Sequence, residues 1–259
     1  MIDTGDARIL LAVDQTTATI TLTRPEKLNA LDLSMIIALE RAAHLIDCNP
    51  VVRVAIITGS GDRAFCAGGD ISAWSKQLPE EFGMLWVRAG HRAFDALTRL
   101  RPPLIAALNG HCLGGGFELA ACADFRVGED HIKLGLPETG IGIIPGWSGT
   151  QRAVQRFGSQ IIRRMAVLGD VLSAEQGLHH GLIDRVVAKG QSLKTAYHLA
   201  SSILERTDLA TSAAKMLINA ADGEDRERAI ETLAGIAAAH GNDLQARLAA
   251  FMSKKEITQ

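Results

Sequence analysis

The first part of the chain shows the alternation of hydrophobic and polar residues typical of strands, and then the spacing typical of a helix. Two short β-rich runs, residues 9–14 and 18–24, flank a polar turn and predict a hairpin. Over residues 31–47 apolar residues recur at helical spacing, and Asp32 precedes them as a suitable N-cap. The chain is therefore expected to open with a hairpin and to continue into an amphipathic helix.

Two continuous apolar runs further along the chain predict buried strands. They are VRVAIITG, which ends at Gly59, and PPLIAALNG, which ends at Gly110. Each is followed by a glycine-rich loop and then by helical spacing, and the runs FRVG and KLGLPE add two short strands. Strands that alternate with helices in this way predict an α/β core with parallel strand pairing.

The pattern changes after about Gly169. From Ser173 to the end, the spacing is nearly all helical, apart from the short run LIDRVVA. The apolar stripes over residues 192–207, 207–221 and 225–240 are broad enough to need covering. The last third therefore predicts a helical region that packs on the core or on another subunit.

Composition narrows the class of protein. A chain of 259 residues with 47% hydrophobic residues and a mean hydropathy of +0.12 can form one large domain, alone or with a small appendage. Only 4% of the residues are aromatic, so the core is expected to consist mainly of Ala, Val, Ile and Leu. A net charge of −2 gives no electrostatic footprint for nucleic acid, so no nucleic-acid partner is expected.

The start of the chain and its cysteines indicate a location. The first ten residues carry Asp3 and Asp6 and lack an apolar stretch, so neither a signal peptide nor a transit peptide is expected. No apolar run is long enough to span a bilayer, and no membrane partner is expected. The four cysteines show no paired spacing and are expected to be reduced, mostly buried thiols. Together these features predict a cytoplasmic protein.

Three short motifs resemble functional patterns but favour simpler interpretations. GWSGT, residues 146–150, is close to the nucleophile elbow of serine hydrolases, yet it ends in Thr150 and no strong strand leads into it. It predicts a helix start capped by Ser148 or Thr150. His179 and His180 have no acidic or cysteine cluster at ligand spacing and predict a helix end. GIGIIPG fails the dinucleotide-binding pattern, because a proline replaces the third glycine.

Two glycine-rich loops, each after a predicted strand, are candidates for binding an oxygen atom. They are FCAGGD, residues 65–70, and the first part of HCLGGGFELA, residues 111–120. Glycine lets the backbone approach a ligand closely, and free N–H groups at a helix N-terminus attract negative charge. One N–H from each loop could hold the same oxygen, as an oxyanion hole without side-chain donors. Either loop alone is equally compatible with a structural role.

Two glutamates extend this interpretation. Glu118 lies three residues after Gly115, on the first turn of the predicted helix, and Glu138 precedes a loop that contains glycine and proline. Two carboxylates beside an oxyanion hole suit general acid–base chemistry on a carbonyl compound. A lone glutamate near a helix start would more often be only a partner of the helix dipole.

Five long motifs in order resemble the crotonase, or enoyl-CoA hydratase/isomerase, superfamily. The resemblance covers most of the chain and includes RPEKLNALD (24–32), FCAGGDI (65–71), NGHCLGGGFELAACADFRV (109–127), GLPETGIGIIPGWSGTQR (135–152) and SAEQGLHHGLIDRVV (173–187). It implies an α/β fold, a crotonase-like spiral of ββα units with a C-terminal helical trimerisation region.

The resemblance also implies a division of the chain and a class of substrate. Residues 1–190 would form the spiral core with the site for a coenzyme A thioester, and residues 191–259 would form the helical oligomerisation region of a homotrimer or a dimer of trimers. The substrate would be an acyl-CoA thioester. Neither a metal nor a further cofactor would be needed, because coenzyme A is part of the substrate.

The catalytic residues implied by the resemblance are Gly69, Gly115, Glu118 and Glu138. The N–H groups of the two glycines would hold the thioester oxygen. Water between the two glutamates would attack the β-carbon of a trans-2-enoyl-CoA, with Glu118 as the base and Glu138 as the proton donor. The implied activity is that of an enoyl-CoA hydratase, a lyase of fatty-acid or related acyl-CoA metabolism.

Further positions are implied to bind the substrate. The N–H of Gly146 would help to place the substrate or water, Asp70 would order its loop, and the basic residues would meet the phosphates of coenzyme A. Those basic residues are equally compatible with ordinary solvated charges. The full set of implied substrate and coenzyme A positions is Arg24, Lys27, Ala67, Asp70, Ile71, Gly146, Trp147, Phe251 and Lys254.

Several positions depart from the family pattern. Gly69 stands where alanine is common, Ser72 stands where many relatives carry lysine, and Trp147 and Ser148 replace small residues. The C-terminal helices also lack an aromatic residue that often contacts the substrate. These departures leave the acyl specificity open rather than the catalytic class.

Other functions remain alternatives at this point. A second crotonase reaction, such as double-bond isomerisation or the hydration or dehydration of a specialised acyl group, is the main one. Isomerases commonly work with one acid–base residue, so the presence of both Glu118 and Glu138 favours hydration. A non-catalytic acyl-CoA or RNA binder fits less well, because both glutamates are present and no basic run is.

Overall fold

A computed structural model describes residues 1–239 of the chain. Two compact units make up the chain, Met1–Ser212 and Ala213–Gln259. Phe251 and Lys254, two of the positions expected to meet coenzyme A, lie outside the described residues.

The first unit contains a six-stranded sheet in the order β1-β2-β3-β5-β7-β10. β1 and β2 pair antiparallel, which confirms the predicted hairpin, and the remaining pairs are parallel. The strands are β1 (Ile9–Asp14), β2 (Thr17–Leu22), β3 (Val54–Gly59), β5 (Leu104–Leu108), β7 (Phe125–Glu129) and β10 (Arg185–Val187).

A second, four-stranded sheet has the order β4-β6-β8-β9. Its strands are β4 (Ala64–Cys66), β6 (His111–Leu113), β8 (Lys133–Gly135) and β9 (Val171–Ser173). The successive pairs β3 and β4, β5 and β6, and β7 and β8 each place one strand in each sheet. This repeated alternation confirms the expected spiral of ββα units.

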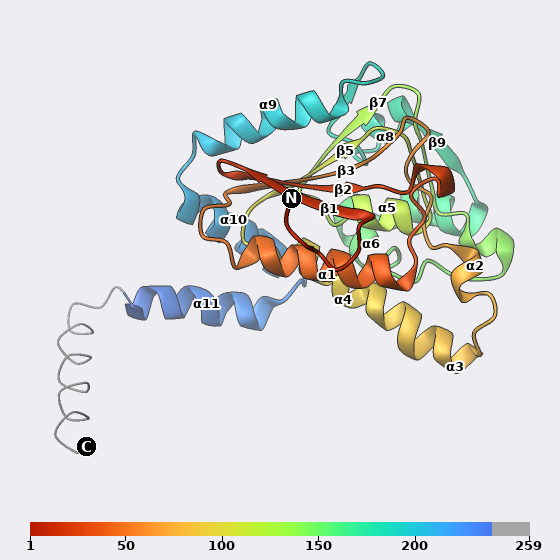
Figure 1. Cartoon of the computed structure of the whole chain (residues 1–259), viewed down its shortest axis with the longest axis horizontal. Coiled ribbons are helices and arrows are strands. Elements are labelled where there is room, and N and C mark those ends of the chain that lie inside the picture. The colour runs from red at the N-terminus through yellow and green to blue at the C-terminus, as the bar shows by residue number, and fades with distance from the viewer. Residues whose placement is uncertain (240–259) are drawn as a thin grey trace. The chain divides into compact units, whose positions relative to one another are not determined.

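Helices cover both faces of the large sheet (Figure 1). On one face α1 (Leu33–Asp47) packs with α4 (Arg88–Thr98), and their apolar residues share a core with Ile57 of β3. On the other face α9 (Ser192–Leu204) packs on β3, β5 and β7, over a smaller core that includes Ile56. Successive residues of β3 point to opposite faces, so a strand covered on both sides needs the continuous apolar run seen in the sequence.

The helix starts show which local predictions hold. The Asp32 carboxylate accepts a hydrogen bond from Met35 N at 3.1 Å, which confirms the predicted N-cap of α1. The predicted cap at Ser148 or Thr150 is wrong, because α6 begins only at Arg152.

The remaining helices of the first unit are short. These short helices are η1 (Pro25–Lys27), α2 (Ile71–Trp74), α3 (Pro79–Glu81), η2 (Phe82–Val87), α5 (Gly115–Ala120), η3 (Glu138–Ile141), α6 (Arg152–Phe157), α7 (Ser159–Arg163), η4 (Arg164–Leu168) and α8 (Ala174–His179). Of these, α5 and η3 carry the two candidate glutamates, and α8 ends at the predicted histidine pair.

The predicted domain boundary at residue 190 falls inside the first compact unit. α9 follows that boundary, yet it packs on the large sheet, because Ala196 and Ala200 complete its second core. α10 (Asp208–Ala221) runs across the division between the units, and α11 (Arg226–Ala239) lies in the second. The proposed oligomerisation role of residues 191–259 stays a prediction.

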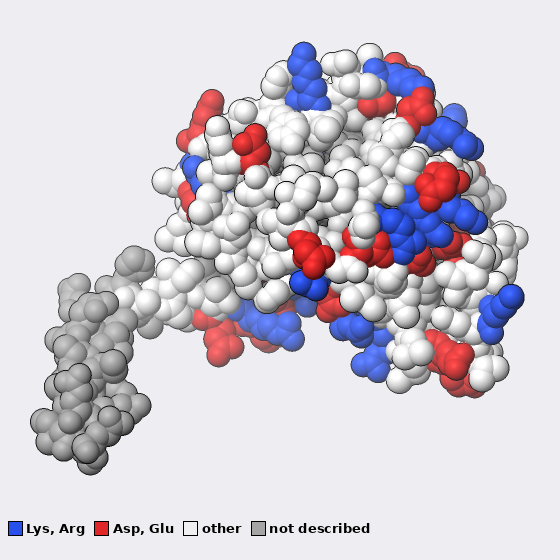
Figure 2. All heavy atoms as spheres, in the orientation of Figure 1, with Lys and Arg blue, Asp and Glu red and all other residues white. Residues whose placement is uncertain are grey.

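The charged surface and the free cysteines agree with what the composition predicts. On the face of the first unit shown in Figure 2, acidic and basic side chains are interspersed, as expected for a chain with a net charge of −2. Cys66, Cys112 and Cys122 are buried free thiols, and Cys48 is an exposed one. Among the helices of residues 1–239, none is long and apolar enough to cross a membrane.

Candidate active site

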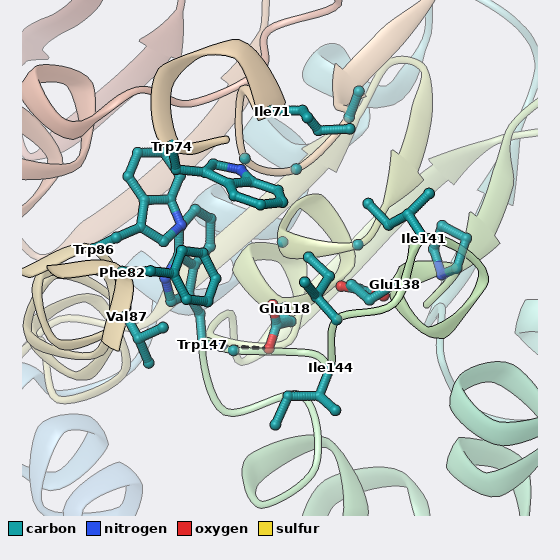
Figure 3. A pocket seen from close by; sticks show the side chains of 18 residues that line it. Ile71, Trp74, Phe82, Trp86, Val87, Glu118, Glu138, Ile141, Ile144 and Trp147 are labelled. Carbon is teal, nitrogen blue, oxygen red and sulfur yellow. Dashed lines mark hydrogen bonds between the residues drawn. The ribbon is translucent and has the colours of Figure 1, made fainter. Parts of the chain in front are cut away.

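A cavity of about 230 Å³ lies between the two predicted glycine loops. Its walls bring together residues that are far apart in the sequence and that come from α2, η2, α5, η3 and the loop before α6 (Figure 3). Eight of the predicted site residues line it: Ala67, Gly69, Ile71, Gly115, Glu118, Glu138, Gly146 and Trp147.

The first loop leaves β4 and brings Gly69 to the lining of the cavity. A β-bridge pairs Leu31 with Gly69: Leu31 N donates to Gly68 O at 2.8 Å, and Asp70 N donates to Leu31 O at 2.7 Å. In such a bridge the flanking residues supply the bonds to the partner, so the N–H of Gly69 itself points to the opposite side. Its direction is therefore set by the pairing of the loop.

The second loop explains the run of three glycines. Gly114 has φ 54° and ψ −129°, a backbone conformation that only glycine adopts readily. A Cβ on Gly116 would lie 1.9 Å from Cys66 O, so α5 can start against β4 only because that residue has no side chain. Gly115 is the first residue of α5, where the N–H has no intrahelical acceptor.

The two loops touch each other. A Cβ built on Gly68 would lie 3.0 Å from Gly115 N, so the backbones are in direct contact. Within residues 1–239, neither the amide of Gly69 nor that of Gly115 has a hydrogen-bond acceptor. Two unpaired backbone donors at one end of a cavity can bind a single oxygen that becomes negatively charged.

Glu118 is fixed by backbone amides. Its side chain is buried at the first turn of α5, and its Oε1 accepts hydrogen bonds from Trp147 N at 2.7 Å and Gly149 N at 2.6 Å. Backbone N–H groups can only donate, so this oxygen is held as an acceptor. A Cβ on Gly149 would lie 2.7 Å from the same oxygen, which explains the glycine there.

Glu138 lines the same cavity, but no backbone amide among the described residues holds its carboxyl group. It begins η3, is buried, and neither carboxyl oxygen has a hydrogen-bond partner among the described residues. A Cβ on Gly114 would lie 3.0 Å from Glu138 Oε1, so this carboxyl group lies directly against the second glycine loop. An unpaired buried carboxyl group that lines a cavity is costly and marks a site that expects a ligand or water.

Burial changes the protonation of both carboxyl groups. It raises the pKa of Glu118 to about 8, and the nearby negative charge of Glu138 adds to that rise. Burial also raises the pKa of Glu138 to about 7. Two neighbouring buried carboxyl groups resist double ionisation, so the pair retains a proton near neutral pH. A site with one ionised and one protonated carboxyl group can remove a proton and supply another.

The raised pKa of Glu138 predicts a stability difference that depends on pH. An unfolded glutamate ionises near pH 4.3, whereas folded Glu138 ionises only near pH 7, so stability is lost as the pH rises through that range. Glu138→Gln cannot ionise and should be more stable than the wild type by about 3 kcal/mol at pH 8. Urea unfolding at pH 8 and pH 5 tests this, because the difference should shrink below about 1 kcal/mol at pH 5. Equal stability of the two proteins at pH 8 would contradict the buried, unpaired carboxyl group.

The loop that binds Glu118 is under backbone strain and is held by a histidine. Ser148 lies between the two donors Trp147 and Gly149, and its φ of 79° is unusual for a residue with a side chain. Its Oγ forms a hydrogen bond of 3.1 Å with Nδ1 of His91 on α4. Burial lowers the pKa of His91, which favours the neutral ring. Because His91 belongs to α4, its hydrogen bond to Ser148 ties the loop that binds Glu118 to that helix.

Two substitutions separate the strain at Ser148 from its hydrogen bond. Ser148→Ala keeps the strained backbone and loses the bond to His91, so it should cost about 1 kcal/mol of stability. Ser148→Gly also loses the bond but relieves a strain of about 1–3 kcal/mol, so it should be no less stable than the wild type. Urea unfolding of both variants measures the difference. Equal losses would show that glycine relieves no strain at this position, and an unchanged stability of Ser148→Ala would show that the bond to His91 does not hold the loop.

Arg24 and Lys27 differ in their surroundings. Arg24 is turned inward, with its guanidinium 2.8 Å from the Asp70 carboxylate and 3.0 Å from Ala30 O. Asp70 also accepts a hydrogen bond from Ser72 N at 3.0 Å, so the pair orders the loop that carries Gly69. Lys27 is exposed on η1. A contact of either basic residue with coenzyme A stays a prediction.

Sequence reasoning missed most of the apolar wall of the cavity. Trp74, Phe82 and Trp86 line it beside Trp147. They lie between residues 71 and 109, where the sequence contains none of the motifs described above. A signal was present, because a chain with only three tryptophans placed two of them within this stretch. Among residues 1–239, no group of three or more His, Cys, Asp or Glu side chains is placed to hold a metal ion.

Comparison with known proteins agrees with the geometry of the cavity. The family model described as enoyl-CoA hydratase/isomerase matches residues 12–257. The chain belongs to the enoyl-CoA hydratase/isomerase family. The paired glycine loops and both glutamates of this site therefore lie within the family's matched region.

Individual relatives cover most of the chain. A crotonyl-CoA hydratase of Syntrophomonas wolfei subsp. wolfei is 35% identical over 86% of this chain and 85% of its own length. A carnitinyl-CoA dehydratase of Salmonella arizonae is 38% identical over 76% of this chain and 74% of its own. The solved structure of an enoyl-CoA hydratase from Bacillus anthracis superimposes with a TM-score of 0.80 at 30% identity, covering 95% of this chain and 96% of that one.

Proposed function

We propose that this member of the enoyl-CoA hydratase/isomerase family adds water to a trans-2-enoyl-CoA to give a 3-hydroxyacyl-CoA. The observation that carries the proposal is the placement of two buried carboxyl groups, Glu118 and Glu138, beside two unpaired backbone amides in one cavity. The relatives named crotonyl-CoA hydratase and carnitinyl-CoA dehydratase support a reaction that adds or removes water.

The amides of Gly69 and Gly115 are proposed to bind the thioester oxygen. Addition of a nucleophile at the β-carbon moves negative charge onto this oxygen, as in an enolate. Donors that are already in place stabilise that charge without reorganising during the reaction. Because both donors are backbone groups, their positions depend on the β-bridge at Leu31 and on the start of α5.

The hydrogen bonds support different proposed roles for the two glutamates. Burial and the charge of Glu138 raise the pKa of Glu118, whereas the two amide donors on its Oε1 favour its ionised form. With the one proton of the pair placed on Glu138, in keeping with these donors, Glu118 is the base that takes a proton from water. Glu138 has no donor among the described residues, which favours its protonated form, so it supplies the proton to the α-carbon. Water gives its oxygen to C3 and one proton to Glu118, while Glu138 gives a proton to C2. Proton exchange with solvent then restores the pair.

An assay with a panel of enoyl-CoA thioesters tests this function. The proposal predicts loss of the enoyl absorbance and formation of the 3-hydroxyacyl-CoA for at least one trans-2-enoyl-CoA. An isomerase would convert a 3-enoyl-CoA to the 2-enoyl-CoA without forming the hydroxy product. Absence of hydration across chain lengths and branched or cyclic acyl groups would contradict the proposal.

We also propose that the protein is a homotrimer or a dimer of trimers in the cytoplasm. Leu217 and Ile218 on α10 and Ile230 on α11 are more than half exposed. Neighbouring large apolar side chains on a protein surface often mark a contact with another subunit. Light scattering at micromolar concentration should give the mass of three or six chains. The mass of one chain, 27.6 kDa, would contradict the assembly.

A further inference from the structure

All three tryptophans of the chain line the same cavity. Trp74, Trp86 and Trp147, together with Phe82, form one side of it and are called the aromatic wall below (Figure 3). Ring centroids are 5.5 Å apart for Trp86 and Trp147 and 5.0 Å apart for Trp74 and Phe82. In a chain with only 4% aromatic residues, this concentration marks the wall as a feature of the site.

The surrounding backbone is shaped to admit these rings. A Cβ on Gly90, inside α4, would lie 2.0 Å from Trp147 Nε1, and one on Gly115 would lie 2.5 Å from the same ring. A Cβ on Gly69 would lie 2.9 Å from Trp86. A glycine inside a helix costs roughly 1 kcal/mol relative to alanine, so its presence in α4 needs a reason such as this packing. The absence of a side chain at Gly69 receives the same explanation, because a Cβ there would meet Trp86.

Burial shows which end of the cavity faces solvent. Ile71, Ile141 and Ile144 are each more than half exposed, whereas in the aromatic wall Trp86 and Trp147 are buried and Trp74 and Phe82 are half-buried. Coenzyme A is large, charged and hydrophilic, so it must leave through the exposed isoleucine side. With the thioester oxygen at the glycine loops, the acyl group then extends toward the aromatic wall.

The lining also restricts the charge of that acyl group. Of the described residues around the cavity, only Glu118 and Glu138 carry ionisable side chains. A distal carboxylate would therefore meet no cationic partner. The wall rings pack in two pairs, Trp86 on Trp147 and Trp74 on Phe82, and Trp147 also packs on Phe94 with centroids 5.2 Å apart. Rings that pack on one another in this way do not surround a cation as an aromatic cage does.

We infer that the acyl group for which this cavity is built is neutral, flat and aromatic: a 3-arylpropenoyl thioester, or the 3-hydroxy-3-aryl thioester that is its hydrate. This inference rests on the proposed hydration. Rigid indole rings offer a flat ring an offset or edge contact, which adds to the gain from burial. A flexible aliphatic chain would be served equally well by the Leu, Ile and Val side chains that form the rest of the core.

Binding of unreactive thioesters tests the acyl group without requiring turnover. Calorimetry with 3-phenylpropanoyl-CoA and with nonanoyl-CoA, which has the same number of acyl carbons, should show at least about tenfold tighter binding of the phenyl compound by the wild type. Trp86→Leu should reduce this ratio to about one, and Trp86→Phe, which keeps a ring, should retain most of it. Phe125→Leu is the matched control, because it removes an exposed aromatic ring outside the cavity and should leave the ratio unchanged.

The outcomes separate this inference from the proposed hydration. Equal or weaker binding of the phenyl compound by the wild type overturns the inference, as does tighter binding of a thioester with a trimethylammonium group. If Trp86→Leu does not fold, the less buried Trp74→Leu and the wild-type ratio still decide the matter.

Turnover provides the second readout. Formation of the arylpropenoyl chromophore from 3-hydroxy-3-phenylpropanoyl-CoA should exceed, in kcat/KM, the dehydration of 3-hydroxynonanoyl-CoA. Preferred binding of the phenyl compound, without hydration or dehydration of any thioester, would support the pocket and contradict the proposed reaction. Hydration of crotonyl-CoA without preferred binding of the phenyl compound would support the proposed reaction and contradict the aromatic acyl group.

Discussion

Replacement of either Glu118 or Glu138 by glutamine should lower kcat for hydration of a trans-2-enoyl-CoA by about 10²–10⁴-fold, the usual contribution of a general acid or base. Glutamine keeps the size of the side chain but cannot accept or release the proton. In the proposed reaction Glu118 activates water and Glu138 protonates the α-carbon, so each change removes a different proton transfer. Both singles and the double variant should be compared with the wild type in the same assay.

The double variant tests whether the two carboxyl groups act as a unit. Groups that act on one water are strongly non-additive, so the double variant should be little slower than the slower single variant. Isomerisation of a 3-enoyl-CoA needs only one group to move a proton, and one of the single variants is expected to keep that side activity. Hydration at the wild-type rate by Glu138→Gln would show that water is not held between the pair.

Loss of the Gly115 amide should slow the reaction by about 10²–10³-fold, the effect of one missing oxyanion donor. Gly115→Pro removes the N–H at the first position of α5, where proline fits a helix. The substitution also adds a Cβ, which would meet the Trp147 ring at 2.5 Å. That steric effect must be separated from the loss of the donor.

Gly115→Ala supplies the matched control, because it adds the same Cβ and keeps the N–H. The ratio of kcat for the alanine and proline variants therefore cancels the shared Cβ and reports the exchange of the N–H for the proline ring, and it should be at least about 100. Circular dichroism should confirm that both variants fold. Equal kcat values for the two variants would remove the Gly115 amide from the account.

The sequence was sufficient to predict those parts of the fold that depend on local pattern. The apolar run of β3 and the cap at Asp32 each depend on neighbouring residues, and both are found where expected. The cap at Ser148 was wrong, because tertiary contacts rather than helix propensity set that segment. Two backbone amides of the segment bind Glu118, and Ser148 bonds His91 from another helix.

The candidate site divides in the same way. Glycine loops and carboxylates have a recognisable chemistry, so the two loops, Glu118 and Glu138 could be selected from the sequence, whereas Gly69 and Gly115 were named only through the family resemblance. The aromatic wall could not, because Trp74 and Trp86 resemble ordinary core residues until the fold brings them beside Trp147. The inward turn of Arg24 toward Asp70 likewise depends on a contact between distant segments.

The origin of the oxygen in the product tests the central claim most directly. Wild-type protein incubated with a trans-2-enoyl-CoA that it accepts, in water enriched in oxygen-18, should yield a 3-hydroxyacyl-CoA that carries one oxygen-18 atom at C3 by mass spectrometry. Glu118→Gln should form this labelled product at least about 100-fold more slowly. An unlabelled isomer as the sole product, or the same rate of labelling in both proteins, would contradict hydration by the glutamate pair.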